Sequence, residues 1–430
     1  MKTDIVVPAL ARVEGEGALY IRLKNGQVDE IQINIYEPPR FFEGLLIGRY
    51  FQEVPDLTAR ICGICPVAYQ MSSAMALEQA LDVDIAPQVS ALRRLLYCGE
   101  YIQSHSLHIY MLQAPDLLGH ESAISLAGEA PDLVRKALRV KKIGNELMRA
   151  IGGRSIHPVN ACVGGFYRWP NRQDLTSLQA DMEWCLEASI ETARWAVTLP
   201  YPEFKQVYEF VALHRPDEYA ILGGEVISSN NLIIPISQFE EAFLEEHIPY
   251  SNALHSRTAS GSPYLTGPLA RLNLNFAQLG KQARQVCEDI GFIPPLQNPY
   301  KSLLARAIEL IQICAEAIEL IVGYNPRGPS RSEITVKEGE GTGATEAPRG
   351  ILYHRYVVSA EGMIRHARIV PPTAQNLARM EADLWSLAPN ILEMPHEQAT
   401  QACEHLIRSY DPCISCATHF LKLKVETNDG

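Results

Sequence analysis

Apolar residues recur at intervals of three and four along much of the chain, which is the spacing of one face of an α-helix. Three runs are long enough for a bundle of antiparallel helices: Gln88–Leu112, Leu133–Ile151 and Leu175–Leu199. A fourth apolar run, Leu303–Tyr324, is interrupted by charged residues, so we expect an amphipathic helix there and not a membrane span. The charged positions in this run are Arg306, Glu309, Glu316 and Glu319.

Proline and capping residues predict where three further helices begin or end. Pro66 suits the first turn of a helix that runs to about Leu81. A second helix, His396–Ser409, ends just before Pro412, because proline cannot continue it. A capping box at Ser237–Glu240 predicts the start of a third helix.

Alternating apolar and polar positions predict β-hairpins near both ends of the chain. Leu19–Leu23 and Val28–Ile35 flank Asn25-Gly26, a pair typical of a type I′ turn. Leu352–Val358 and Met363–Val370 form the second predicted hairpin. The sequence shows no repeat and no low-complexity linker, so we expect an α+β fold with a central bundle of long helices and peripheral β-hairpins.

We treat the whole chain, residues 1–430, as one module with four segments. These are an N-terminal hairpin and first CxxC motif at 1–86, a helical bundle at 87–200, a mixed α/β region at 201–300, and a C-terminal helix, hairpin and second CxxC motif at 301–430.

Composition narrows the possible functions. The chain has 430 residues, which is long enough for two or three packed lobes. Its net charge of −12 speaks against a nucleic-acid partner, since phosphates require a basic face. Ten cysteines are too few for a disulfide scaffold, and the start of the chain has no targeting segment, so we expect reduced thiols in a cytoplasmic protein.

Two CxxC pairs stand at opposite ends of the chain, Cys62/Cys65 and Cys413/Cys416. Thiolate sulfur selects zinc, copper(I), nickel or iron-sulfur units. Three interpretations are open at this point: a structural zinc site, two separate redox dithiols, and a buried metal centre completed only by the tertiary fold. If the predicted helix begins at Pro66, its dipole favours thiolate at the first pair.

The residues around these cysteines resemble two motifs of the large subunits of NiFe hydrogenases. The first pair lies in RICGICPVAYQ and the second in DPCISCATHF. Five further blocks are similar to blocks of the same family and come in the same order: ARVEGEG at Ala11–Gly17, PRFFEGLLIGR at Pro39–Arg49, HPVNACVGG at His157–Gly165, TEAPRGILYH at Thr345–His354 and VPPTAQN at Val370–Asn376.

The resemblance implies a Ni-Fe centre held by all four cysteines. Cys62 and Cys413 would be terminal nickel ligands, and Cys65 and Cys416 would bridge to an iron that carries CO and two CN− ligands. A metal centre at these cysteines is consistent with charge balance, because divalent metal ions compensate the negative charges of four buried thiolates.

The resemblance also implies roles for residues beside the metals. Cys413 would receive the proton from H2, and Glu14 would pass it outward. Arg349 would extend over the open metal position, and Asp411 would orient it. Thr373, in the block that contains Pro372, would donate a hydrogen bond to one cyanide.

A second, harder cation site is implied near the C-terminus. Glu43 and His419 resemble ligands of a magnesium ion, with iron as an alternative because imidazole also suits it. Eleven residues, Phe420–Gly430, follow His419, and we predict that this tail is retained and packs over both ligands.

Two positions depart from the family pattern. Tyr69 stands where many members have histidine, which alters a hydrogen bond to a bridging sulfur. Ser104, before His105, stands where many have aspartate, which removes one partner of Arg349. Both departures favour the cytoplasmic, pyridine-nucleotide-linked branch of the family, group 3 and 3b-like.

Electrons need a partner to leave the site, because the remaining cysteines are scattered singly and no GxGxxG motif is present. These cysteines are Cys98, Cys162, Cys185, Cys287, Cys314 and Cys403. The resemblance implies an iron-sulfur small subunit, then flavin and iron-sulfur subunits that react with NADP or NAD, and maturation proteins that insert the metals. Alternatives are coupling to deazaflavin or heterodisulfide reductase, a quinone-binding relative from complex I, and a zinc-stabilised structural protein.

Overall fold

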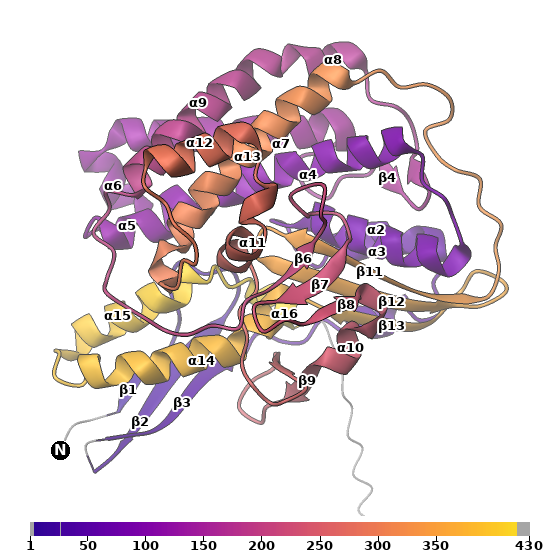
Figure 1. Cartoon of the computed structure of the whole chain (residues 1–430). Helices are drawn as coiled ribbons and strands as arrows, with labels where there is room; N and C mark the ends of the chain where they lie inside the picture. Colours follow the sequence, from indigo (N-terminus) through magenta and orange to yellow (C-terminus); the bar gives the residue numbers. More distant parts are fainter. Residues whose placement is uncertain (1–3, 26, 419–430) are drawn as a thin grey trace, which may run out of the picture.

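Long helices form where the apolar spacing predicts them. The computed structural model describes residues 4–25 and 27–418. Four long helices pack against one another as the bundle at the top of Figure 1: α4 (Pro87–Leu107), α7 (Pro131–Gly152), α9 (Gln179–Ala196) and α13 (Ser302–Gly323). The helix predicted to reach Leu112 continues beyond α4 as a π-helical turn, His108–Gln113. The helix predicted from Leu175 is divided at Leu178, so that α8 (Arg172–Ser177) precedes α9.

The other helices are shorter or surround the bundle. They are α1 (Phe42–Leu46), α2 (Val54–Ala59), α3 (Pro66–Leu81), α5 (Ala114–Leu117), α6 (Ala123–Glu129), α10 (Phe239–Ala242), α11 (Pro268–Leu274), α12 (Lys281–Asp289), α14 (Pro372–Ile391), α15 (His396–Ser409) and α16 (Ile414–Ala417). Both α3 and α15 match the predicted bounds, which confirms the use of Pro66 and Pro412 as markers of helix ends.

Every strand pairing in the described residues is antiparallel, and the strands form five small sheets. The sheets are β1 (Ile5–Val7), β2 (Gly17–Lys24) and β3 (Gln27–Ile35); β4 (Ala161–Cys162) and β5 (Gly165–Phe166); β6 (Val211–His214), β7 (Glu225–Ser228) and β8 (Ile233–Pro235); β9 (Phe243–His247) and β10 (Leu254–Thr258); and β11 (Gly339–Ala347), β12 (Gly350–Val358) and β13 (Ile364–Val370). Both predicted hairpins are present, as β2–β3 and β12–β13. This mixture of helix and sheet confirms the α+β class.

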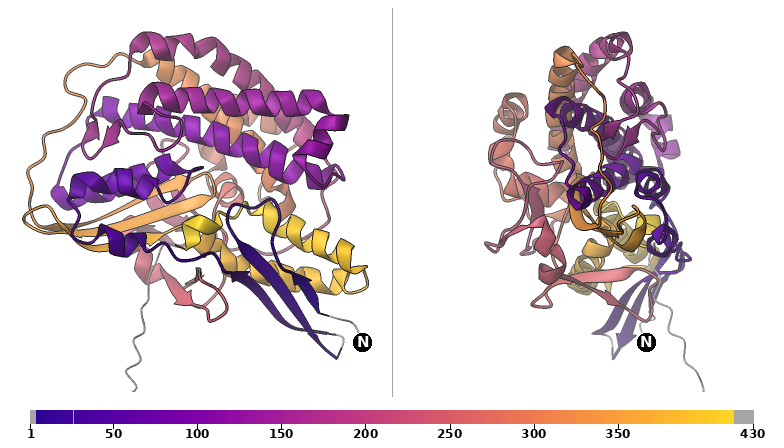
Figure 2. Two further views of the ribbon diagram at one scale, coloured as in Figure 1. Left: turned by 180° about the vertical axis from the view of Figure 1, so that it is seen from behind. Right: turned by 90° about the vertical axis from the view of Figure 1, so that its right-hand side faces the viewer.

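The β11–β13 sheet lies below the bundle and carries α3 on one face (Figure 2). Three glycines at alternate positions of β11 make this contact possible, because a Cβ at Gly343 would stand 2.5 Å from the carbonyl oxygen of Ser72. Cβ atoms at Gly339 and Gly341 would approach the α3 backbone still more closely. Helix and strand therefore meet backbone to backbone, which fixes the N-terminus of α3 relative to the end of β11.

One predicted helix is only a short turn, and its predicted cap is wrong. The capping box at Ser237–Glu240 does not form, and the segment makes only the short α10 before it enters strand β9. Phe239 and Phe243 are both buried, and they pack with Tyr353 and Tyr264 in a separate hydrophobic cluster. Phe239 begins α10 and Phe243 begins β9, so the chain leaves the helix at the residue whose ring joins this cluster, and tertiary packing limits the helix to one turn.

The helix α13 confirms the predicted segment but is more deeply buried than an amphipathic surface helix. Arg306 and Glu309 have 1% and 0% of their surface exposed, so these charges face the interior. Within the described part of the chain, no helix is both long and apolar enough to cross a membrane.

The contact between α3 and β11 can be tested with Gly343→Ala. We expect a loss of about 1–3 kcal/mol in the free energy of unfolding, because the added methyl group overpacks two backbones. The measurement is the urea midpoint of the metal-free protein. Gly128→Ala is the matched control, since Gly128 lies in α6 with no atom within 4 Å of an added Cβ. Equal midpoints for the two variants would contradict the role given to this glycine.

Candidate metal centre

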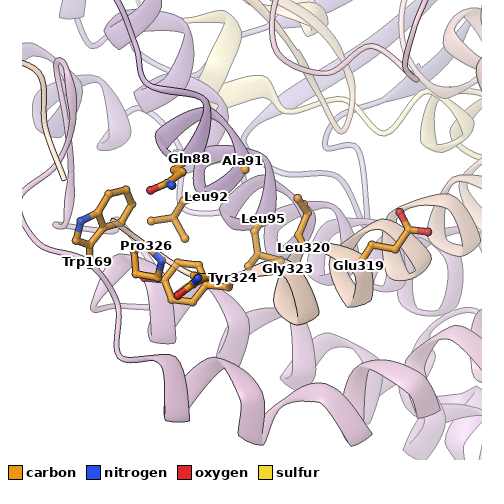
Figure 3. A pocket seen from close by; sticks show the side chains of 11 residues that line it. Gln88, Ala91, Leu92, Leu95, Trp169, Glu319, Leu320, Gly323, Tyr324 and Pro326 are labelled. Atoms are coloured by element: carbon orange, nitrogen blue, oxygen red, sulfur yellow. The ribbon is translucent and has the colours of Figure 1, made fainter. Parts of the chain in front are cut away.

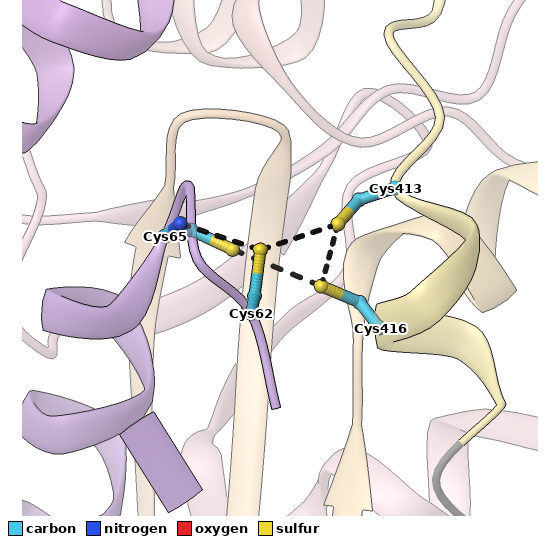
Figure 4. A group of neighbouring side chains, drawn as sticks. All are labelled: Cys62, Cys65, Cys413 and Cys416. Carbon is cyan, nitrogen blue, oxygen red and sulfur yellow. Dashed lines mark hydrogen bonds between the residues drawn. The ribbon is translucent and has the colours of Figure 1, made fainter. Parts of the chain in front are cut away.

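Four cysteine sulfurs from the two ends of the chain meet in one buried place (Figure 4). The Sγ atoms of Cys62 and Cys413 are 3.4 Å apart, and those of Cys65 and Cys416 are 3.8 Å apart. All four sulfurs lie within 4.8 Å of one another. Of the three interpretations open from the sequence, two separate dithiols are therefore wrong, and a metal site completed by the fold agrees with the geometry.

The spacing of the sulfurs suits a metal ion. A thiolate-bound ion with metal–sulfur bonds of ~2.3 Å places tetrahedral sulfurs ~3.8 Å apart. The sulfurs are buried and belong to loops that end on helices: Cys65 is the N-cap of α3 and Cys413 the N-cap of α16. Geometry alone suits zinc as well as nickel, so the donor set establishes a soft-metal site and not the identity of the ion.

Burial keeps most of these thiols from ionising without a cation. Hydrogen bonds from the other three thiols, first that of Cys413, hold the pKa of Cys62 well below its usual value. Burial raises the pKa of Cys413 well above its usual value, and it also raises that of Cys416. The four sulfurs therefore need positive charge from a metal to become thiolates together.

The N-terminus of α3 is shared between a cysteine sulfur and a buried carboxyl group. The amides of Ile64 and Cys65 donate to Cys62 Sγ at 3.3 and 3.4 Å. Both oxygens of Glu100, on α4, accept hydrogen bonds from the amides of Val67 and Ala68, at 2.6 and 3.1 Å. Glu100 is fully buried, and burial raises its pKa well above the ordinary value. Sequence reasoning missed this residue, since nothing in α4 indicates which helix end it caps.

Glu14 lies directly beside the second cysteine pair. Its Oε2 is 3.1 Å from Cys413 Sγ and accepts a hydrogen bond of 3.1 Å from the amide of Ser415. Its backbone carbonyl accepts a hydrogen bond from Ile414. Gly15 has a φ of +89°, and a Cβ there would collide with the side chains of Glu37 and Ile414, so glycine is needed at this point.

Two arginines that the sequence did not single out hold these segments in place. Arg40 donates to the carbonyl oxygens of both Ile61 and Ser415, and so ties the first cysteine motif to the second. Arg408 forms a two-bonded ion pair with Asp116 and also donates to the carbonyl of Ala11. The block that contains Arg40 was recognisable in the sequence, but the partners of the arginine were not.

The polar residues predicted beside the metals come together around Cys413. Arg349 donates to the backbone oxygen of Asp411 at 2.8 Å and to its Oδ1 at 3.0 Å. Thr373 Oγ1 accepts a hydrogen bond of 2.9 Å from the amide of Cys413, which leaves its hydroxyl proton free to donate elsewhere. Pro372 is the first residue of α14 and precedes Thr373.

Arg271 is a further positioning residue that sequence reasoning missed. It is fully buried, and its guanidinium donates to the carbonyl oxygens of Ala347 and Pro348, the residues just before Arg349. It also pairs with Glu309 and Glu346. Its block, GPLAR at residues 267–271, was the signal available in the sequence.

The two departures from the family pattern are buried. Tyr69 lies one helical turn after Cys65, and its side chain interacts with Cys416. Burial, then the charge of Cys416, raises its pKa well above the ordinary value. Ser104 Oγ has no partner in the described ranges, and the carboxylate that Arg349 contacts is that of Asp411.

The predicted magnesium site cannot be assembled here, because His419 and the tail 420–430 lie outside the described residues. Glu43 lies at the start of α1, and its Oε1 accepts a hydrogen bond of 2.7 Å from the amide of Ile369.

The other cysteines are buried, as expected for side chains that fill the core. One pair is not isolated, however: Cys185 on α9 and Cys314 on α13 have sulfurs 3.5 Å apart. Within 4–25 and 27–418, the CxxC cysteines form the only group of three or more His, Cys, Asp or Glu side chains that could hold a metal ion.

The apolar pocket in Figure 3 is separate from the cysteines. It has a volume of about 190 Å³ and lies between the start of α4 and the end of α13, with Leu92, Trp169 and Tyr324 in its lining. Leu92 is eight residues before Glu100 on α4, about 12 Å along the helix. The pocket is therefore not part of the cysteine site.

Comparison with known proteins identifies the family. The family described as nickel-dependent hydrogenase matches residues 40–136 and 243–419. The chain is 33% identical to sulfhydrogenase 1 subunit alpha of Pyrococcus furiosus, over 97% of this chain and 98% of that protein. It is 26% identical to the NAD-reducing hydrogenase HoxS subunit beta of Cupriavidus necator, over 98% and 96% of the two chains.

Comparison of the fold with solved structures supports the same family. A crystal structure of an NAD+-reducing NiFe hydrogenase in the H2-reduced state superposes with a TM-score of 0.85 and 28% identity, over 97% of this chain and 99% of that chain. The four buried sulfurs, the surrounding blocks and the whole-length matches agree, and the protein belongs to the nickel-dependent hydrogenase family as a large subunit.

Proposed function

We propose that this chain interconverts H2 with protons and electrons at a Ni-Fe centre bound by Cys62, Cys65, Cys413 and Cys416, and passes the electrons toward NADP or NAD. The observation that carries the proposal is the contact between Cys413 Sγ and Glu14 Oε2, at 3.1 Å, at the edge of a four-sulfur site. A structural zinc site has no need of a carboxylate at one ligand sulfur. Removal of a proton from H2 does need a base, and the Glu14 carboxylate can serve as one.

Membership of the nickel-dependent hydrogenase family supports the metal set. Cys62 and Cys413 would be terminal ligands of nickel, and Cys65 and Cys416 would bridge to an iron that carries CO and two CN− ligands. When bound, these metals supply the electrophilic position at which H2 is cleaved and its electrons are collected. Thr373 supports the assignment of cyanide, because its hydroxyl accepts from the Cys413 amide and keeps its proton for another acceptor.

The chain's own residues would handle the proton and the charge. Cys413 Sγ would take the proton and transfer it to Glu14, which is half-buried. Arg349 is 3% exposed and directed by Asp411, so that it supplies a fixed positive charge beside the cysteines. The charges of Asp411, Cys413, Cys65 and Cys62 together keep the pKa of Arg349 well above its usual value despite burial.

Partners complete the electron path. The relatives are named as subunits, and one of them is an NAD-reducing hydrogenase. We propose an iron-sulfur small subunit in contact with this chain, flavin and iron-sulfur subunits beyond it, and maturation proteins that insert the metals.

Reduced cysteines and a nicotinamide acceptor favour the cytoplasm. We also propose a magnesium or iron ion at Glu43 and His419.

Metal content tests the function first. Protein isolated from its own host should contain nickel near one per chain, with iron beyond that of any partner clusters. Cys62→Ala should lose the nickel, because three sulfurs leave the centre open, whereas Cys98→Ala should retain it, since Cys98 is buried in α4 away from the site. Zinc near one per chain with no nickel would mean a structural site and would end the proposal.

Glu14→Gln should slow H2 oxidation by about 10²-fold, because it removes a positioned base. Nickel content should stay at the wild-type level, since Glu14 is not a metal ligand. Glu16→Gln is the matched control: Glu16 is two residues away and exposed, and its turnover should equal that of the wild type. Initial rates of H2-dependent dye reduction measure both. Wild-type turnover in Glu14→Gln would contradict the proposed proton route.

A further inference from the structure

One carboxylate beside the cysteines is shared by two buried guanidinium groups. Asp411 Oδ1 accepts from Arg349 Nη2 at 3.0 Å, and Oδ2 lies 3.8 Å from Arg306 Nη2. The three side chains are 1–3% exposed. Arg349 comes from the turn between β11 and β12, and Arg306 comes from α13. Asp411 therefore joins two separate parts of the fold just before Cys413.

Arg306 depends on Asp411, since its other acidic neighbour is already engaged. Glu309, one turn further along α13, accepts hydrogen bonds from both Nε and Nη2 of Arg271. It also accepts from His105 and from Tyr219. In the described part of the chain, Arg306 Nε and Nη1 have no hydrogen-bond partner. Burial lowers its pKa to about 10, so it remains charged at neutral pH.

Further buried polar atoms without partners belong to the residues around this pair. His108 is in electrostatic contact with Arg306, Asp411 and Arg349. Its Nε2 donates to the carbonyl of Arg408, so its Nδ1 is an acceptor, and this acceptor has no partner within the described ranges. The same holds for Asp411 Oδ2 and for Ser104 Oγ, one turn before His108. The surroundings of this pair therefore contain both donors and acceptors that the described protein atoms leave unpaired.

Because residue 104 is serine in this chain, the second arginine, Arg306, becomes important for holding Asp411. The family pattern that this chain resembles often places aspartate at this position, where it would partner Arg349. With Ser104 in its place, Asp411 is the carboxylate that contacts either guanidinium in the described residues. A carboxylate held by only one of its two oxygens could rotate and release Arg349.

We propose that Arg306 is a positioning residue for Arg349. It engages Oδ2 of Asp411, so that Oδ1 and the backbone oxygen of Asp411 hold Arg349 beside the four cysteines. The unbalanced positive charge of the two arginines is then compensated by the metal-bound thiolates. This inference rests on the proposed hydrogenase function and adds a residue to it.

The test compares Arg306→Met with Arg306→Lys and with a control, Arg94→Met, in the intact complex. Arg94 is a buried arginine on α4 that pairs with Glu316 on α13, away from the cysteines, so its loss reports general damage to the same helix pair. We expect Arg306→Met to lower kcat for H2 oxidation by about 10–100-fold, with nickel content and KM near wild type. Arg306→Lys should recover part of this loss, because it restores the charge. Arg94→Met should lower the thermal midpoint without lowering kcat.

Two further readouts separate positioning from stability. The infrared stretching bands of the CO and CN− ligands should shift in Arg306→Met and not in Arg94→Met, because a displaced Arg349 would change the charge beside the centre that would carry these ligands. In a Ser104→Asp background, Arg306→Met should cost at least about twofold less in kcat than in the wild type, since the added carboxylate gives Arg349 a second partner.

Several outcomes would overturn the inference. These are wild-type kcat in Arg306→Met at full nickel content, an equal loss of kcat in Arg94→Met, unshifted infrared bands, or additive effects of the two substitutions. Wild-type complex without nickel would instead show that the proposed function itself fails, whatever Arg306 does.

Discussion

The sulfurs of Cys62 and Cys413 are 351 positions apart in the chain and 3.4 Å apart in space. Holding them there requires that both ends of the chain be fixed to a single frame. The N-terminal segment is bound to the C-terminal one through the backbone of Glu14 and Ile414, and Arg40 donates to the carbonyls of both cysteine motifs. The glycines of β11 bring α3, and with it Cys65, against the sheet that leads to Arg349.

The interior of the protein also contains a buried network of charged and polar side chains centred on Glu309. Glu309 accepts hydrogen bonds from Arg271, His105 and Tyr219, which belong to different elements of the fold. Burial raises its pKa, but Arg271 and His105 outweigh burial and lower it to about 2. Burial lowers the pKa of His105 to about 4, so the imidazole is neutral at neutral pH. Because removing one partner would leave another charge buried and unpaired, such a network tolerates little change in geometry.

The sequence was most informative where local signals are strong. Pro66 and Pro412 marked helix ends that the structure confirms, and Asn25-Gly26 marked a hairpin. The four cysteines and Glu14 were found through their motifs, and the structure brings them together. The failures concern residues whose partners are distant in sequence. Glu100 caps a helix from a different element, and the helix predicted from Ser237 is cut to one turn where Phe243 enters β9 and joins a distant cluster.

The position of Glu100 has a consequence for how the site is filled. Its carboxyl group accepts from the amides of Val67 and Ala68, so these two amides are not available to the sulfurs. Burial raises the pKa values of Cys413 and Cys416, so before metal arrives these sulfurs hold their protons. A divalent ion must displace those protons to bind, because only thiolate is a good ligand. Loading the site is thus an exchange of hydrogen ions for metal, and it becomes less favourable as the surroundings become more acidic.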